Sequence, residues 1–253
     1  MPVVLDVRDL HAGYGRMAVV VGISLNVCAE ELVGLIGRNG AGKTTTVRAI
    51  AGLRDGVFSG IVEVNGVPVQ RLGSAKVVGC GLVLVPEGRR IFSSMTVSEN
   101  LRLGSFSRRR QPARERERNL ERVMALFPGL VPFLETRAGQ LSGGQQQMVA
   151  VGRGLMAGPK VLILDEPTAG LAPNLSEELY RVMRQLADSG VGVLVVEQSI
   201  ELALQHCDRA YVMDRGQIVR AGGVQELSKE HVTEAIMGRA ASGGGAPEAP
   251  APS

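Results

Sequence analysis

The stretch Gly37-Arg38-Asn39-Gly40-Ala41-Gly42-Lys43-Thr44 decides the fold of this 253-residue chain. The apolar run 32–36 before it predicts a buried strand, and the composition of 45–53 after it predicts a helix. In this context the pattern G-x-x-x-x-G-K-[ST] is typical of a phosphate-binding loop. Its glycines let consecutive backbone N–H groups wrap an anion, while Lys43 can reach the outer phosphate oxygens and Thr44 offers a hydroxyl to Mg²⁺. The alternative is a chance glycine turn before a helix.

Two adjacent carboxylates, Asp165 and Glu166, follow a second apolar run, 161–164. Successive side chains of a strand point to opposite sides, so the two carboxylates can serve different purposes. With a phosphate-binding loop in the same chain, we expect Asp165 to hold Mg²⁺. Glu166 is expected to orient or deprotonate the water that attacks the γ-phosphate.

A third segment, Leu141-Ser142-Gly143-Gly144-Gln145, precedes an amphipathic helix. Serine and glycine at a helix start can form a second anion-binding N-terminus, although the same residues also describe a flexible loop. One nucleotide does not need two such sites. We therefore expect two chains to pair head to tail, each supplying one half of two composite ATP sites.

Further apolar runs alternate with helical patterns along the chain. The predicted strands are 3–8, 23–27, 32–36, 61–64, 67–69, 81–85, 161–164, 191–196 and 210–213. Asn65-Gly66 predicts a tight hairpin turn. A helix with the apolar face Leu175, Leu179, Val182 and Leu186 separates two of the strands. Strands that alternate with helices predict an α/β fold whose mainly parallel sheet is covered on both faces.

A helical lobe is predicted from residue 96 to about residue 158, beginning with a capping box at Thr96 and Glu99. Its expected buried helix face is Leu120, Val123, Met124 and Phe127, and the expected solvated stretch is 114–118. The triplet Arg108-Arg109-Arg110 could grip phosphates or lipid headgroups, or could be a solvated helix end.

The composition indicates a globular protein. Hydrophobic residues make up 45% and charged residues 21%, which excludes disordered, collagen-like and coiled-coil chains. The apolar stretches fall well short of the roughly 20 residues that a spanning helix needs, so any membrane role is expected to depend on a partner. Asp6, Arg8 and Asp9 argue against a secretory signal. We expect one domain, 1–239, and a disordered tail, 240–253, rich in Ala, Gly, Pro and Ser.

Cysteine content and net charge exclude other classes of protein. Cys28, Cys80 and Cys207 are far apart and predict neither a disulfide framework nor a zinc site, so we expect buried small residues. A net charge of +3 could suggest nucleic acid, but the chain has only five Phe and three Tyr for stacking on bases. No nucleic-acid partner is therefore expected.

The order and separation of the three motifs resemble those of the ATP-binding-cassette (ABC) ATPases, over about residues 2–238. Within that family the chain looks like an ATPase subunit of a bacterial branched-chain amino-acid importer. The more specific segments are Val85-Pro86-Glu87-Gly88-Arg89-Arg90-Ile91-Phe92, Gly170-Leu171-Ala172-Pro173 and Val196-Glu197-Gln198. The resemblance implies a P-loop NTPase core with a mainly parallel sheet, an N-terminal antiparallel β subdomain and an inserted helical subdomain at about 96–158.

The resemblance also implies roles for individual residues. Tyr14 would stack on adenine, although a plain turn tyrosine is the alternative, and Ser142 would close on the partner's γ-phosphate. The implied nucleotide contacts are Tyr14, Gly37, Arg38, Asn39, Gly40, Ala41, Gly42, Lys43, Thr44, Thr45, Leu141, Ser142, Gly143, Gly144 and Gln145. The implied catalytic residues are Lys43, Glu87, Glu166 and Gln198, and the implied metal-site residues are Thr44, Glu87 and Asp165.

Three positions depart from the general cassette pattern. Glu87 stands where Gln is usual, Ala172 where Asp is usual, and Gln198 where His normally contacts the γ-phosphate. A glutamine donates a neutral hydrogen bond and does not titrate, so we expect weaker transition-state stabilisation at that site. This favours asymmetric sites in a heterodimer with a sister ATPase.

The resemblance thus implies an ATP- and Mg²⁺-dependent subunit that energises uptake of branched-chain amino acids across the inner membrane. The implied partners are a sister ATPase or a second copy, two permease subunits and, indirectly, an extracytoplasmic binding protein. The helical lobe and the Glu87 loop would meet the permease on the cytoplasmic face. Alternatives are an importer of urea, short amides or other amino acids, and a non-transport ABC ATPase. A GTPase is disfavoured because the chain has no Asn-Lys pair for a guanine reader.

Overall fold

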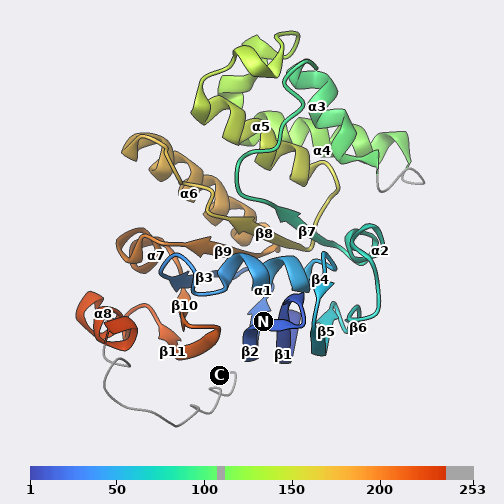
Figure 1. Cartoon of the computed structure of the whole chain (residues 1–253). Helices are drawn as coiled ribbons and strands as arrows, with labels where there is room; N and C mark the ends of the chain where they lie inside the picture. The colour runs from blue at the N-terminus through green and yellow to red at the C-terminus, as the bar shows by residue number, and fades with distance from the viewer. Residues whose placement is uncertain (107–111, 238–253) are drawn as a thin grey trace.

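The computed structural model describes residues 1–106 and 112–237, which form two sheets and a group of helices (Figure 1). The helical group lies on one side of a parallel sheet, and the antiparallel sheet lies beyond the opposite face (Figure 1). The expected α/β fold is confirmed. None of the described helices is both long enough and apolar enough to cross a membrane.

The parallel sheet has six strands in the order β11-β10-β3-β9-β8-β7, and only β11 runs antiparallel to its neighbour. Their bounds are β3 Leu32–Gly37, β7 Leu82–Val85, β8 Val161–Asp165, β9 Gly192–Glu197, β10 Arg209–Asp214 and β11 Gln217–Gly223. All residues of β3, β8 and β9 are buried, as their apolar runs predict. The sequence predicts no strand after 213. β11 forms because Arg215 and Gly216 both adopt positive φ and turn the chain back.

The antiparallel sheet has the order β2-β1-β5-β6, with β4 beside β1. Its strands are β1 Val3–Gly15, β2 Met17–Cys28, β4 Asp55–Gly56, β5 Phe58–Val64 and β6 Val67–Pro68. β1 and β2 are longer than the predicted 3–8 and 23–27, because irregular register between them lets pairing continue past the regular alternation. The turn at Asn65 (φ 50°) and Gly66 (φ 73°) is confirmed.

The inserted lobe is helical, as predicted. Its elements are α3 Val97–Gly104, α4 Ala113–Leu126, the 3₁₀ turns Pro128–Phe133 and Ala138–Gln140, and α5 Gly143–Leu155. The capping box of Thr96 and Glu99 is present, and Val123 and Phe127 are buried. Residues 114–118 are exposed, as expected. The triplet 108–110 and the tail 240–253 lie outside the described residues.

The remaining helices are α1 Lys43–Ile50, α2 Ser74–Gly79, α6 Pro173–Asp188, α7 Ile200–His206 and α8 Lys229–Met237. α1 contacts both sheets and therefore joins them into one core. It begins and ends earlier than the predicted 45–53, because Gly42 caps it and Gly52 (φ 75°) breaks the helical backbone. On α6, Leu179, Val182 and Leu186 are buried as predicted, and Leu175 is half-buried.

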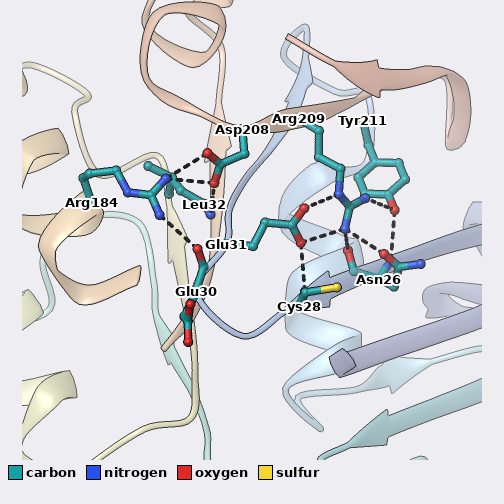
Figure 2. Close-up of polar contacts among 9 residues, drawn as sticks. All are labelled: Asn26, Cys28, Glu30, Glu31, Leu32, Arg184, Asp208, Arg209 and Tyr211. Carbon is teal, nitrogen blue, oxygen red and sulfur yellow. Dashed lines mark hydrogen bonds and ion pairs between the residues drawn. The ribbon is translucent and has the colours of Figure 1, made fainter. Parts of the chain in front are cut away.

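A polar network joins the two sheets near the start of β10 (Figure 2). The Arg209 guanidinium donates to the Glu31 carboxylate and, at 2.7 Å, to the carbonyl oxygen of Asn26 in β2. It also donates to the hydroxyl of Tyr211, which is buried. The network lies at the start of β3 and β10, whereas the phosphate-binding loop follows the end of β3.

The second part of this network holds α6. Asp208 accepts from Arg184 and from the backbone N–H of Leu32, each at 2.8 Å (Figure 2). Cys28 lies beside the network and is half-buried, as is Cys80, so the expectation of three buried cysteines is correct only for Cys207. The difference arises because Cys28 ends β2 and Cys80 follows α2, where side chains are less covered.

Candidate functional site

The phosphate-binding loop lies between the end of β3 and the start of α1. Gly42 caps α1 with φ 99°, a left-handed backbone that glycine adopts at little cost. At Gly37 a Cβ would lie 2.4 Å from the carbonyl oxygen of Met213, so only glycine fits between the loop and β10. Lys43 is 4% exposed, and its Nζ donates to the carbonyl oxygens of Gly37 at 2.8 Å and Arg38 at 3.2 Å.

The loop forms one wall of a cleft of about 360 Å³. The cleft is lined by Val19, Asn39, Gly40, Ala41, Gly42, Lys43, Thr44, Thr45, Glu87, Glu166 and Gln198. Residues from five separate segments, far apart in the sequence, therefore meet at one opening. Two other predicted residues, Gly37 and Arg38, accept hydrogen bonds from Lys43 through their carbonyl oxygens. The cleft is not lined by Tyr14, Asp165 or the segment 141–145.

The two carboxylates at the end of β8 lie in different surroundings. Asp165 is 2% exposed and accepts a hydrogen bond from the Thr44 hydroxyl at 3.3 Å. Burial raises the pKa of Asp165 to about 6; the Thr44 hydrogen bond opposes this, and the charges of Glu166 and Glu87 add to it. The two carboxylates therefore lie in different environments, and their expected division of roles stays a prediction.

Glu166 faces the cleft and has φ 48°, which is unusual for a residue other than glycine. Its Oε1 lies 3.5 Å from the Nζ of Lys43. Its Oε2 accepts a hydrogen bond from the Nε2 of Gln198. The side chain of Glu166 is thus held between the phosphate-loop lysine and Gln198, the residue after β9.

The donor set fits Mg²⁺. This cation is usually held by one or two protein oxygens together with substrate phosphates and water, rather than by a protein cage. The Thr44 hydroxyl and the Asp165 carboxylate are adjacent beside the loop. No group of three or more His, Cys, Asp or Glu side chains suited to a metal occurs in the described part of the chain. Glu87 lines the same cleft and acts on Asp165 through its charge.

The segment 141–145 begins α5 and lies apart from the cleft lining. Ser142 caps the helix: its hydroxyl accepts from the N–H of Gln145 at 3.3 Å, and its own N–H donates to the Gln145 side chain at 3.0 Å. This ordered capping box excludes the flexible-loop alternative. Arg89, for which the sequence predicted no role, reaches this helix start. A Cβ on Gly143 would lie 2.9 Å from its guanidinium.

Similarity to known proteins extends over most of the chain. The ABC transporter family model matches residues 20–169, which is more than half of the chain. The chain belongs to the ABC transporter ATPases. BraG of Pseudomonas aeruginosa, a high-affinity branched-chain amino acid transport ATP-binding protein, is 40% identical over 226 residues, covering 89% of this chain and 95% of BraG.

Two further relatives agree with this membership. LivF of Archaeoglobus fulgidus, a probable branched-chain amino acid transport ATP-binding protein, is 31% identical over 228 residues, covering 90% of this chain and 95% of LivF. The ADP conformation of MJ1267, an ATP-binding cassette of an ABC transporter, has a TM-score of 0.79 and 26% identity, covering 92% of this chain and 94% of that chain. The family resemblance, the fold class and the ATPase activity expected from the sequence are confirmed.

Tyr14 of this ABC ATPase is the last residue but one of β1. It pairs with Met17 of β2, so it is the first residue of the hairpin turn 14–17, and it also pairs with Asp55 of β4. The residue is 46% exposed, and its hydroxyl lies 3.4 Å from the hydroxyl of Thr45 at the edge of the cleft. That the ring stacks on adenine stays a prediction.

Two polar residues behind the cleft of the ABC ATPase had no predicted role. Glu197, the last residue of β9, is 3% exposed and accepts a hydrogen bond from the Thr168 hydroxyl at 2.7 Å. Burial raises the pKa of Glu197 to about 7, against the hydrogen bonds from Thr168 and the Gln198 N–H, and the charge of Glu166 adds to the rise. The sequence signal that could have identified Glu197 is its position as a carboxylate at the end of an otherwise apolar strand.

Proposed function

We propose that this ABC ATPase is the energy-coupling subunit of an importer for branched-chain amino acids. The observation that carries the proposal is the cleft in which Lys43, Glu166 and Gln198 converge on the phosphate-binding loop. The similarity to BraG and LivF, both described as branched-chain amino acid transport proteins, supports the substrate class. The subunit would act on the cytoplasmic face of the membrane through its permease partners.

In the proposed reaction, the loop N–H groups and Lys43 bind the β- and γ-phosphates. Thr44 and Asp165 would hold Mg²⁺, which neutralises the phosphate charge when it is bound. Lys43 then exchanges its contact with Glu166 for phosphate oxygens, which leaves the Glu166 carboxylate available to accept a proton from the attacking water. Gln198 would orient Glu166 and donate a neutral hydrogen bond to the γ-phosphate.

A second ATPase chain would complete the site. Its Ser142 and the start of its α5 would contact the γ-phosphate from across the interface. The position of 141–145 outside the chain's own cleft supports this arrangement, because the anion-binding helix start has no role there. We propose a heterodimer with a sister ATPase. The neutral Gln198 gives this chain the weaker of the two sites, and ATP-dependent closure drives the permease.

A groove of about 410 Å³ supports docking of the permease on the helical lobe. It lies between β7 and the helices α3 and α5, and includes Val85, Leu103 and Gly154. Phe92 and Phe106 on its wall are 51% and 58% exposed, so the groove presents apolar surface to solvent. The groove adjoins the Glu87 segment, so a permease helix seated there could act on the nucleotide cleft.

Transport in a reconstituted system tests the proposed function. Proteoliposomes would contain this ATPase, its sister subunit and their permeases, with Mg·ATP inside and the cognate binding protein outside. We expect ATP-dependent uptake of leucine, isoleucine or valine. Uptake of urea or another amino acid in their place would contradict the substrate class, and no uptake of any substrate would contradict the import role.

Gln198→Ala is expected to lower the ATP turnover of the assembled transporter by about tenfold, since one charge-assisted contact of about 1.5 kcal/mol is removed. Binding of Mg·ATP should change little, because Lys43 and the loop are untouched. Steady-state hydrolysis and equilibrium binding measure the two effects. Turnover that stays at the wild-type level, together with strong homodimer cooperativity of the chain alone, would refute the asymmetric-site proposal.

A further inference from the structure

We propose that Glu197 is a positioning residue for ATP hydrolysis. Its buried carboxylate attaches the turn that contains Glu166 to the end of β9, which Gln198 follows. This inference rests on the proposed roles of Glu166 and Gln198 and adds a residue that contacts neither substrate nor metal. The contact that carries it is the hydrogen bond from the Thr168 hydroxyl to Glu197 Oε1, 2.7 Å long and buried.

The turn that begins at Glu166 needs such support. Glu166 has φ 48°, a left-handed backbone conformation that is unfavourable for a residue with a Cβ. Its N–H donates to the carbonyl oxygen of Val196 at 3.0 Å, and its own carbonyl oxygen accepts from Ala169 at 3.2 Å. The position of the Glu166 carboxylate in the cleft therefore depends on how the turn is attached to β9.

Glu197 provides this attachment from the interior. The five residues of β9 before it are apolar or glycine and buried, so a carboxylate there loses hydration that an apolar residue would not lose. Thr168 compensates for part of this loss through its hydroxyl and its backbone N–H, and so does the N–H of Gln198. A single carboxylate thus holds the turn after β8 and the residue after β9.

Glu197, the last residue of β9, and Gln198, which follows it, have different roles. Side chains that follow one another along an extended chain point to opposite sides. Glu197 points inward to Thr168, whereas Gln198 points into the cleft and donates to Glu166. The buried hydrogen bond between Thr168 and Glu197 fixes the backbone positions of the turn and of the end of β9. The hydrogen bond between Gln198 and Glu166 in the cleft depends on those positions. Loss of the buried hydrogen bond should displace Glu166 without disturbing Lys43, Thr44 or the loop.

Thr168→Val tests the inference in the complete transporter assembly. Valine keeps the shape of threonine but removes the hydroxyl donor. We expect the kcat for ATP hydrolysis to fall at least tenfold, while the Kd for a fluorescent ATP analogue with Mg²⁺ stays within twofold. Thr168→Ser keeps the hydroxyl and should retain most of the activity. Glu197→Ala should match Thr168→Val, and the double variant should lose no more than the stronger single variant.

Tyr211→Phe is the matched control. It also removes one buried hydroxyl, but in the network at the opposite end of the sheet (Figure 2), and is expected to leave kcat unchanged. The inference is overturned if Thr168→Val keeps kcat within twofold, if its nucleotide affinity falls in parallel with kcat, if Thr168→Ser is equally impaired, or if the two losses add. Wild-type assembly without ATP turnover would instead refute the proposed function itself.

Discussion

Glu166→Gln is expected to bind Mg·ATP and to lose ATP turnover by at least about 10²-fold, the lower end of what general-base catalysis contributes. The amide keeps the size of the side chain but cannot accept the proton of the attacking water. Lys43 and the loop remain in place, so ATP affinity should be equal to or higher than that of the wild type. The measurement is single-turnover hydrolysis beside equilibrium binding in the assembled transporter.

Glu121→Gln is a suitable control for this variant, because Glu121 lies on the exposed face of α4 and the same charge is removed there. Its turnover should equal that of the wild type. Turnover by Glu166→Gln at the wild-type rate would remove Glu166 from the role of the base. Loss of ATP binding in the same variant would show that the Lys43 contact, rather than proton transfer, is the function of the carboxylate.

Lys43→Ala is the second variant with a large expected effect. Lys43 is the buried cation of the cleft wall, held by two carbonyl oxygens that orient its Nζ toward the cleft. Charge-assisted contacts of this kind contribute about 1.5–3 kcal/mol each, so loss of contacts to two phosphate groups should weaken Mg·ATP binding by roughly 10²-fold or more. Hydrolysis should fall further, since the charge also stabilises the transition state.

Equilibrium binding of Mg·ATP to the isolated subunit measures the first effect directly. Lys160→Ala, which removes an exposed lysine before β8, is the control and should bind like the wild type. Lys43→Ala that binds Mg·ATP with wild-type affinity would contradict the assignment of the cleft as the nucleotide site. Lys43→Arg adds a test of geometry, because the larger planar guanidinium does not fit a position that is 4% exposed.

The local patterns predicted most of the elements correctly. Buried strands such as β3 and β8 are short apolar runs, the helical lobe begins at a capping box, and the hairpin at Asn65 is a local turn preference. The extended pairing of β1 and β2 and the edge strand β11 were missed. Their residues alternate irregularly, and they are strands because a neighbouring strand supplies the hydrogen bonds.

The residues of the candidate site also fall into those that the sequence predicted and those that only the structure showed. The phosphate-binding loop could be predicted because its chemistry needs eight consecutive residues, whose glycines and lysine the sequence displays. Arg89, Thr168 and Glu197 could not be assigned, because their contacts join segments that lie far apart in the chain. The family resemblance placed Gln198 at the position that contacts the γ-phosphate. Its hydrogen bond to Glu166 appears only in the folded chain.

The sequence by itself determined that this protein binds nucleotide, since the loop, the carboxylate pair and the segment at Ser142 are each short and contiguous. Tertiary structure alone decided which of these meet. The parallel order β3-β9-β8 brings the ends of three strands to one edge, which places Glu166 and Gln198 beside Lys43. The start of α5 lies outside that cleft. Backbone hydrogen bonding between strands, which is not encoded in any single segment, is the physical reason that these ends share one edge.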